Sequence, residues 1–322
     1  MKKIVAIVLM IMFTLPGLKA QMPGPYAHVD QMVWVVKDLN EVVRGWKQLG
    51  FNSFYNVGYV DALQGSISLA RFGEADIVFI QPGSNNKPLA AFLEKNGDGV
   101  FSLAHRFANY NELKDEVERL KSKGIGVLNQ GSIDTGEGMI YYAFMDTMGK
   151  GKYVLGLVAG FDPHQELNAQ APYGGKFTQY AFAVENPEPV SKFWAKVGLP
   201  VMDITHPGLK ESRYYGKPAD FDMNLGWQRH GDVTYEWCIP LKGPTVYHDH
   251  IKKHGEGVQH IGINVPDIDQ VIKKWEDLGY KVAQSGAWGE KGKPGSGRYA
   301  YIDTDEIGGL MVELLWNYKA VN

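Results

Sequence analysis

The chain carries the same strand–helix pattern three times, and this repeat constrains the fold more than any other feature. In each copy, a polar residue in an apolar strand is followed by a Trp fifteen residues later and a Gly nineteen residues later. The three copies start from Gln31, Gln179 and His260. One such unit cannot bury its apolar face alone, so neighbouring units must pack together. We therefore expect a protein assembled from copies of one supersecondary unit.

Each copy combines a strand with a helix. Alternating apolar residues predict strands with one buried face, at residues 32–36, 180–184 and 261–265. Each strand leads into a residue type that caps helix N-termini, namely Asp38, Asn186 and Asp267. A helix of about three turns is then expected to turn its Trp inward and to end near the Gly.

A second repeat extends the unit by further strands. Residues 142–147 match residues 299–304, and ten residues after the Asp of each segment comes Gly156 or Glu313. Turn residues and β-forming runs fill the chain between helix and strand, so each unit is predicted to be β-α-β-β-β. The four units cover residues 26–82, 98–159, 176–240 and 256–317.

These units predict an α+β protein of two domains, each made of two paired units. About 300 residues after the N-terminal segment are enough for two cores. Pro and Gly residues indicate a linker at 161–175 between an N-terminal domain at 21–160 and a C-terminal domain at 176–322. Cys238 is the only cysteine, so no disulfide within the chain supports the fold.

The first 20 residues have the pattern of a secretory signal peptide. Lys2 and Lys3 precede an uncharged apolar run at 4–15, and Ala20 offers a small residue before a cleavage point. The alternative is a membrane anchor, but the run is short of the roughly 20 residues that span a bilayer. We expect a periplasmic or secreted protein without a membrane segment after cleavage. The net charge of −3 gives no electrostatic basis for nucleic-acid binding.

Tandem β-α-β-β-β units resemble the vicinal oxygen chelate superfamily, which contains glyoxalase I, methylmalonyl-CoA epimerase, extradiol dioxygenases and bleomycin-resistance proteins. The resemblance is strongest where residues 235–240 lead through Gly243 and Pro244 to residues 254–261. That passage resembles the epimerase branch, in which an E-L-L-x-P strand precedes an H-G-E-G-x-H-H-I strand. The resemblance implies two domains with cupped mixed sheets, a small-molecule substrate, and a monomer or homodimer.

The resemblance also implies a metal site in the C-terminal domain. In this superfamily the first and last strands of each unit contribute ligands, which here correspond to Gln179, Glu236, His260 and Glu313. This donor set implies one divalent ion, with Ni, Co, Mn, Fe and Zn all compatible. Taken singly, each residue has an ordinary structural explanation. Glu236 and Glu313, however, interrupt apolar strands, where a carboxylate without a partner is costly.

The N-terminal domain lacks the same set. Its matching positions are Gln31, Val78, Gly156 and either His105 or Ser102, because helix offsets favour the histidine and the distance to Gly156 favours the serine. Both carboxylates are missing in either alignment. This domain is therefore predicted to be a scaffold, a lid or a binding surface.

Other candidate residues match no motif position. The run 248–250 contains two histidines and an Asp but lies on a predicted surface helix, where residues two apart point in different directions. His206 and His230 are interpreted as solvated loop residues, and Asp220 or Asp222 as a candidate second base. The glycine-rich loop 286–297 is either a flexible connection or a substrate lid. In the second case Lys291, Lys293 and Arg298 are available to meet an anion.

The superfamily's proton-transfer branches suggest the reaction. Glu236 and Glu313 would act as bases on two sides of a substrate whose oxygens contact the metal, as in a lyase or isomerase. An extradiol dioxygenase normally needs His, His and Glu, whereas the first position here is Gln179. Methylmalonyl-CoA epimerase acts on a CoA thioester that an exported protein should not meet. A glyoxalase acting on a glutathione adduct and a metal-free binding protein of the bleomycin-resistance type remain as alternatives.

Overall fold

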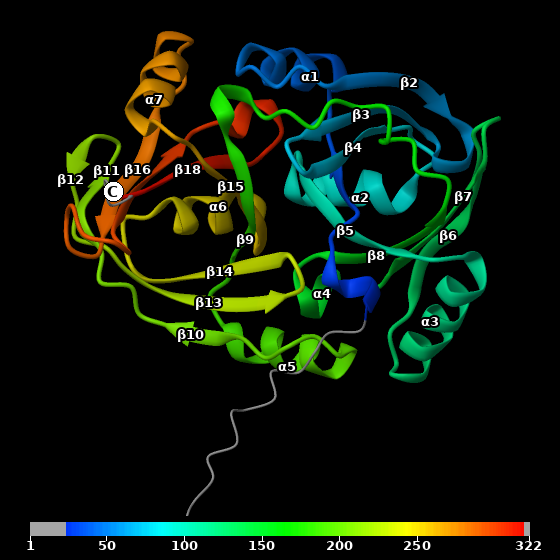
Figure 1. Cartoon of the computed structure of the whole chain (residues 1–322). Coiled ribbons are helices and arrows are strands. Elements are labelled where there is room, and N and C mark those ends of the chain that lie inside the picture. The colour runs from blue at the N-terminus through cyan, green and yellow to red at the C-terminus, as the bar shows by residue number, and fades with distance from the viewer. Residues whose placement is uncertain (1–23, 319–322) are drawn as a thin grey trace, which may run out of the picture.

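The computed structural model describes residues 24–318, so the predicted signal peptide at 1–20 lies outside the described part. The strands of this part form two curled sheets that lie side by side (Figure 1). The first sheet contains β1 (Gln31–Val35), β2 (Phe54–Val60), β3 (Gly65–Phe72), β4 (Ala75–Pro82), β5 (Gly99–Phe107), β6 (Val127–Asp134), β7 (Met139–Met145) and β8 (Val154–Gly160). The second contains β9 (Lys176–Ala183), β10 (Asp203–Thr205), β11 (Lys210–Tyr214), β12 (Lys217–Pro218), β13 (Asp222–His230), β14 (Val233–Lys242), β15 (Gly257–Asn264), β16 (Val282–Trp288), β17 (Gly297–Ile302) and β18 (Met311–Asn317).

The two sheets share one topology at their centres. The first has the order β2-β3-β4-β1-β5-β8-β7-β6, and the second contains β13-β14-β9-β15-β18-β17-β16. In both, the first strands of two units pair antiparallel, and each runs parallel to the last strand of its own unit. Each sheet is therefore mixed and curls into a cup. This arrangement confirms the predicted α+β fold of paired β-α-β-β-β units.

Three of the helices begin directly after the predicted caps. The helices are α1 (Leu39–Gln48), α2 (Lys87–Asn96), α3 (Tyr110–Ser122), α4 (Met148–Gly151), α5 (Pro187–Val197), α6 (Val246–His254) and α7 (Ile268–Asp277). The predicted caps are confirmed, because Asp38, Asn186 and Asp267 each accept a hydrogen bond from a backbone N–H in the first turn of their helix. No helix in the range 24–318 has the length and hydropathy to cross a membrane.

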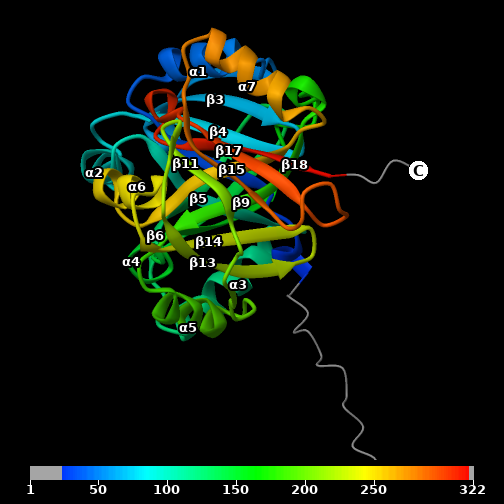
Figure 2. The same cartoon turned by 90° about the vertical axis from the view of Figure 1, so that its left-hand side faces the viewer.

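Two of the three repeated Trp residues hydrogen-bond from one half of the molecule to the other. Trp194 donates its indole N–H to the carbonyl of Gly151 at 3.0 Å, and Trp275 donates to the carbonyl of Leu49 at 3.3 Å. In the other direction, Trp34 donates to the carbonyl of Gly308 at 2.6 Å. A buried indole N–H needs an acceptor, so each pair fixes orientation as well as apolar burial. The backs of the two sheets thus share one core, to which α1 and α7 contribute side by side (Figure 2).

Each cup also has its own inner core. The N-terminal cup is lined mainly by aliphatic and Phe side chains and by Tyr142, with Leu89 of α2 among them. The C-terminal cup holds Cys238 and three tyrosines, of which Tyr247 comes from α6. The equivalent helices α2 and α6 meet where the side-chain amide of Asn96 donates to the carbonyl of His254 at 2.6 Å. The same frame therefore encloses an apolar cup and a polar one.

Candidate metal centre

Four side chains from four adjacent strands converge on the floor of the C-terminal cup. The Gln179 amide of β9 donates to Glu236 Oε2 of β14 at 2.6 Å and to Glu313 Oε2 of β18 at 3.0 Å. His260 Nε2 of β15 lies 3.3 Å from the same Glu236 oxygen and 3.4 Å from the Glu313 oxygen. All four residues are buried. The structure thus brings together the predicted ligand set, with the carboxylates on the two outer strands of the group.

A β-bulge aims His260 into this cluster. The pairing of β15 with β9 shifts register between Val258 and His260, which leaves Gln259 as the extra residue. Bulges redirect side chains in this way. His260 Nδ1 lies 2.6 Å from Gln259 Oε1, and since an amide oxygen only accepts, Nδ1 carries the proton. In the neutral ring the Nε2 lone pair then faces the carboxylates, and this buried nitrogen has no hydrogen-bond partner.

The electrostatics of the cluster favour a positive charge at its centre. Burial raises the pKa of Glu236, and the neighbouring Glu313 raises it further, although His260 opposes the shift. Burial lowers the pKa of His260, but Glu236 and Glu313 outweigh this effect and raise the pKa to about 9. Two buried carboxylates without a positive charge are costly. The site is satisfied either by a proton on His260 or by a divalent ion in its place.

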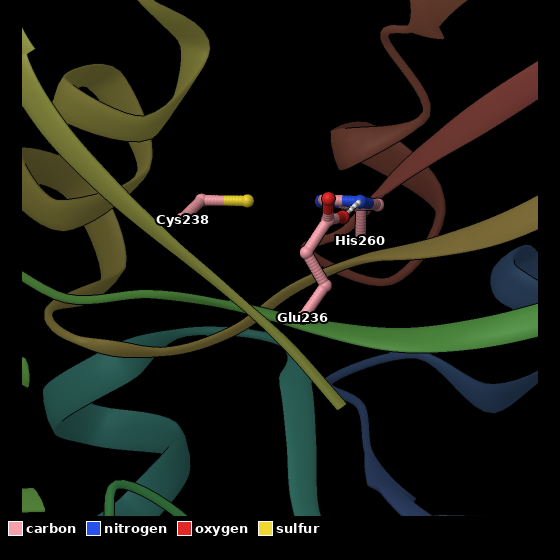
Figure 3. Close-up of side chains that lie close together, drawn as sticks. All are labelled: Glu236, Cys238 and His260. Carbon is pink, nitrogen blue, oxygen red and sulfur yellow. Dashed lines mark ion pairs between the residues drawn. The ribbon is translucent and has the colours of Figure 1, made fainter. Parts of the chain in front are cut away.

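Cys238 extends the cluster along β14. Its sulfur, a Glu236 oxygen and a His260 nitrogen all lie within 4.8 Å of one another, and Figure 3 shows the three side chains facing a common space. Burial, followed by the charges of Glu236 and Glu313, raises the pKa of the Cys238 thiol well above its usual range. A neutral thiol is a weak ligand beside oxygen and imidazole donors. The two-residue spacing on one strand face signals this neighbour in the sequence, but sequence reasoning missed it.

The cluster opens into a cavity of about 840 Å³. Aromatic and aliphatic side chains dominate its walls, with a few polar groups among them. The Tyr299 hydroxyl is buried and has no hydrogen-bond partner among the described residues, whereas Tyr301 and Tyr247 bond to each other at 2.8 Å. Lys210 is the single cationic residue of the lining, and its Nζ contacts the carbonyl of Gly289 at 2.8 Å. A largely apolar cavity with a few convergent polar groups is typical of a small-molecule site.

The family assignment follows from comparison with known proteins. The model of the Glyoxalase/Bleomycin resistance protein/Dioxygenase superfamily matches residues 30–144 and again 178–301. The chain belongs to this superfamily. The two matches fall on the two cups, and they confirm the predicted vicinal oxygen chelate fold.

Relatives of the chain within the superfamily differ in chemistry. It is 23% identical over 201 residues to a lactoylglutathione lyase of Schizosaccharomyces pombe, covering 61% of this chain and 63% of that protein. A mutant of 4-hydroxymandelate synthase from Streptomyces coelicolor has a similar structure, with a TM-score of 0.61, 17% identity, and coverage of 91% and 93% of the two chains. A fusion of a xylose isomerase-like TIM barrel with a 4-hydroxyphenylpyruvate dioxygenase has a TM-score of 0.51 at 13% identity, covering 96% of this chain and 52% of that one. At these identities the structural neighbours establish the fold alone.

The sheet register decides which N-terminal residue of this superfamily member corresponds to His260. Glu313 lies beside Gly262 in the parallel pair β15–β18, and Gly156 lies beside Ala104 in the parallel pair β5–β8. The residue two positions before Ala104 is Ser102, and the bulge recurs there, between Val33 and Trp34 of the partner strand. Ser102 is therefore the equivalent of His260. His105 lies on the other face, buried, with Nδ1 2.7 Å from the His28 carbonyl.

The remaining candidates do not join the cluster. His248 bonds Thr245, and Asp249 accepts from Tyr214 at 2.6 Å. His250 is buried, so the expectation of a surface helix is wrong for this face of α6; burial and the nearby His254 lower the pKa of His250 to about 3.

Two further expectations change in the same way. Arg298 pairs with Asp269 through two contacts of 2.8 Å, while Trp288, Gly289 and Gly295 of the 286–297 loop line the cavity and Lys291 and Lys293 do not. His230 was expected in solvent and is buried, with Nδ1 2.6 Å from the Tyr26 carbonyl.

The acidic side chains of the third unit also lie apart from the cavity. Asp222 lies 3.4 Å from His206, and Asp220 pairs with Lys242. Neither Asp lines the cavity, so neither is placed to act as a second base.

Proposed function

We propose that the chain is an exported, divalent-metal-dependent lyase or isomerase that abstracts a proton next to a carbonyl of a small oxygenated substrate. One observation carries this proposal: Gln179, Glu236, His260 and Glu313 meet at the floor of a large cavity with an imidazole lone pair aimed between two carboxylates. The superfamily contains metal-dependent enzymes, and the similarity to a lactoylglutathione lyase supports a lyase.

The residues of the cluster fit a divalent ion. Two carboxylate oxygens, one amide oxygen and one imidazole nitrogen would hold Ni, Co, Mn, Fe or Zn. For Gln179 this requires the amide to present its oxygen, because its nitrogen now bonds both carboxylates. The unpartnered Nε2 of His260 is the observation that favours the fit. When bound, the ion would polarise the substrate oxygens as a Lewis acid.

The two carboxylates are placed to move the proton. β14 and β18 flank the central pair β9–β15, so Glu236 and Glu313 reach the floor from two sides. The raised pKa of Glu236 makes this carboxyl a stronger base than an exposed one and brings it closer to the working pH of a general acid–base group. One carboxylate would take the proton from a carbon and the other would return it. The buried Tyr299 hydroxyl is available to donate to a substrate oxygen.

The cavity also bears on the alternatives. A glutathione adduct carries two carboxylates, whereas Lys210 is the only cationic lining residue. A smaller substrate with an apolar body and at most one anionic group fits this lining better. Ring-cleaving oxygen chemistry would call for an imidazole at the position of Gln179, although the four-unit length agrees with a dioxygenase. A metal-free binding role would not explain why two carboxylates are buried together at the floor of the cavity.

Export rests on the N-terminal pattern of Lys2, Lys3 and the apolar run at 4–15. Expression of the full chain in a Gram-negative host, followed by fractionation and N-terminal mass analysis, tests it. A periplasmic product that begins near Gln21 would support export. An uncut product in the cytoplasm would refute it.

The metal proposal is tested by elemental mass spectrometry on dialysed protein. Wild type should carry about one divalent ion per chain, and Glu236→Gln and His260→Ala should carry none. Ser102→Ala is the matched control, because Ser102 occupies the same strand position in the other cup and should leave the ion in place. Wild type that takes up no Ni, Co, Mn, Fe or Zn would overturn the enzyme proposal in favour of a binding protein.

The reaction itself is tested by proton exchange. The metal-loaded protein is incubated in D₂O with a panel of small 2-oxo and 2-hydroxy carbonyl compounds, and deuterium at the carbon next to the carbonyl is followed by NMR. Exchange that Glu313→Gln abolishes would support proton transfer. Oxygen consumption without exchange, in the iron-loaded protein, would favour the dioxygenase alternative.

A further inference from the structure

The N-terminal cup contains a second cavity, separate from the metal centre. Its floor is an apolar pocket of about 120 Å³, which opens through shared walls into a surface cleft of about 890 Å³. The shared walls include Val57, Val60, Leu69 and Ile133. Val78 and Ala104 occupy the floor, where the other cup carries Glu236 and Gly262. The floor therefore accepts an apolar group and no charged one.

The mouth of this cavity has the opposite character. The charged residues in the cleft lining are all acidic, and no Lys or Arg is among them. The acidic residues are Asp61, Asp134, Glu137, Asp162 and Glu166. Asp162 lies 3.6 Å from His164 and 3.9 Å from Arg106. The other four form no ion pair with any residue of the range 24–318. Five carboxylates around one opening create a negative potential that attracts cations.

The neighbouring arginines neutralise little of this mouth, because Arg106 is shared between Asp30 and Asp162. Arg106 is paired with Asp30, and Arg71 is paired with Asp76. Aromatic residues of β2 add a further feature that favours a cation. Tyr55 and Tyr59, which line the cleft, have exposed fractions of 60% and 57%. Tyrosine faces bind ammonium groups, so these two exposed side chains add to the attraction of the mouth for a cation.

A buried polar group lies in the same cup. Ser102 occupies the position of His260, is completely buried, and its hydroxyl has no hydrogen-bond partner among the described residues. A Cβ at Gly156 would lie 2.7 Å from that hydroxyl, so the close packing beside it admits only glycine. Ser102 does not line the cavity, which nevertheless remains open where the other cup carries its ligands.

We infer that the N-terminal cup binds a small organic amine, with a short alkyl or aryl group in the floor and its ammonium at the acidic mouth. An apolar cavity of roughly 150 Å³ admits a group about the size of benzene, and the floor here is slightly smaller. The ammonium would be met by the carboxylates and the tyrosine faces. This site is independent of the metal centre and of the proposed reaction.

The test is calorimetric titration of the mature full-length protein with hexylamine, hexan-1-ol and hexanoate. Hexylamine should bind about tenfold more tightly than hexan-1-ol, hexanoate should not bind, and added salt should weaken only the amine. The double variant Asp61→Asn, Glu137→Gln should bring hexylamine to the level of the alcohol while it keeps the metal content of wild type. Val78→Phe, which fills the floor, should weaken both the amine and the alcohol.

Two results would overturn the inference. Equal affinities for hexylamine and hexan-1-ol would show that the acidic mouth does not bind the ammonium group. Loss of hexylamine binding in Glu313→Gln, with full binding retained in the Asp61, Glu137 double variant, would place the amine in the C-terminal cup. Because the surface double variant does not touch the core, a folding failure of Val78→Phe leaves the first comparison intact.

Discussion

The N-terminal and C-terminal cups share strand order, pairing direction and a bulge at the same position, but differ in the side chains that face their cavities. Gln31 and Gln179 match, whereas Val78, Ser102 and Gly156 stand where the other cup has Glu236, His260 and Glu313. The backbone therefore does not by itself make a metal site. These three side chains make the difference between a cup that favours a cation at its floor and one that excludes charge there. The comparison agrees with the rule that function depends on the residues of a site and not on the fold.

The largest expected difference between the cups is catalytic. Glu313→Gln removes a ligand and a base, so turnover should fall by about 10³-fold or more. The circular dichroism spectrum of the folded chain should stay unchanged. The matched change in the other cup is Ser102→Ala, which should leave the rate within twofold or so of wild type. Steady-state kinetics on whichever compound exchanges its proton checks both. Comparable losses in the two variants would break the distinction between the cups.

The bulge residue Gln259 offers the next test. Its amide oxygen fixes the His260 ring, and loss of such a supporting hydrogen bond usually weakens metal binding by about 10–100-fold. Gln259→Leu should show this loss in a chelator competition titration, and Gln259→Glu should restore most of it because a carboxylate also accepts from Nδ1. The equivalent bulge residue of the other cup is Phe101, and Phe101→Leu should leave the metal affinity unchanged. Unaltered affinity in Gln259→Leu would contradict the positioning role.

The stability of the metal-free protein should depend on pH through His260 of the C-terminal cup. Without metal, the carboxylates raise the pKa of His260 to about 9, above its unfolded value of 6.5. The stability that protonation contributes is therefore complete below pH 6.5 and is lost as the pH rises through about 9. In chelator, the melting temperature of wild type should decline over this window, and that of His260→Gln should decline less.

The metal affinity should change in the opposite sense. A proton and an ion compete for Nε2, so the affinity should fall about tenfold for each pH unit below 9. Metal titrations between pH 7 and pH 9 check this slope. An affinity that does not depend on pH in this range would mean that His260 is not a ligand.

The smallest effect concerns packing in the N-terminal cup. A Cβ at Gly156 would lie 2.6 Å from the Ala104 Cβ and 2.7 Å from the Ser102 hydroxyl. Gly156→Ala should therefore lower the free energy of unfolding by about 1–3 kcal/mol through overpacking. Ala104→Gly, which copies Gly262 of the other cup, should relieve part of this in the double variant. Denaturant unfolding measures both, and a neutral Gly156→Ala would show that the cup has more room at its floor than the structure indicates.

Much of the fold was predictable because it depends on local patterns. Asp38, Asn186 and Asp267 are confirmed as helix caps, since a short polar side chain before an apolar period satisfies the first backbone N–H groups wherever the helix lies. The repeat spacing predicted paired β-α-β-β-β units and therefore cupped sheets. The spacing did not reveal that Trp194 and Trp275 hydrogen-bond across the two halves. Which carbonyl meets an indole depends on how the two sheets pack.

The candidate site was also predictable only in part. The positions of Gln179, Glu236, His260 and Glu313 could be predicted from the superfamily resemblance, in which the first and last strands of each unit contribute ligands. The choice between Ser102 and His105 could not, because α3 has 13 residues and α7 has 10, which moves the Leu120 and Gly124 offsets from Ser102 to His105. The burial of His230 and the pairing of Arg298 with Asp269 were missed for a related reason. Both depend on residues distant in sequence.

The sequence alone determined the number of units, their internal order and the starts of the three helices with predicted caps. These follow from periodicity and residue type, which act over a few residues along the chain. Only the tertiary structure decided the tautomer of His260, the neighbourhood of Cys238, and the open acidic mouth of the N-terminal cup. Each of these arises where strands or loops far apart in sequence meet, so their geometry is set by packing and burial instead of by local pattern.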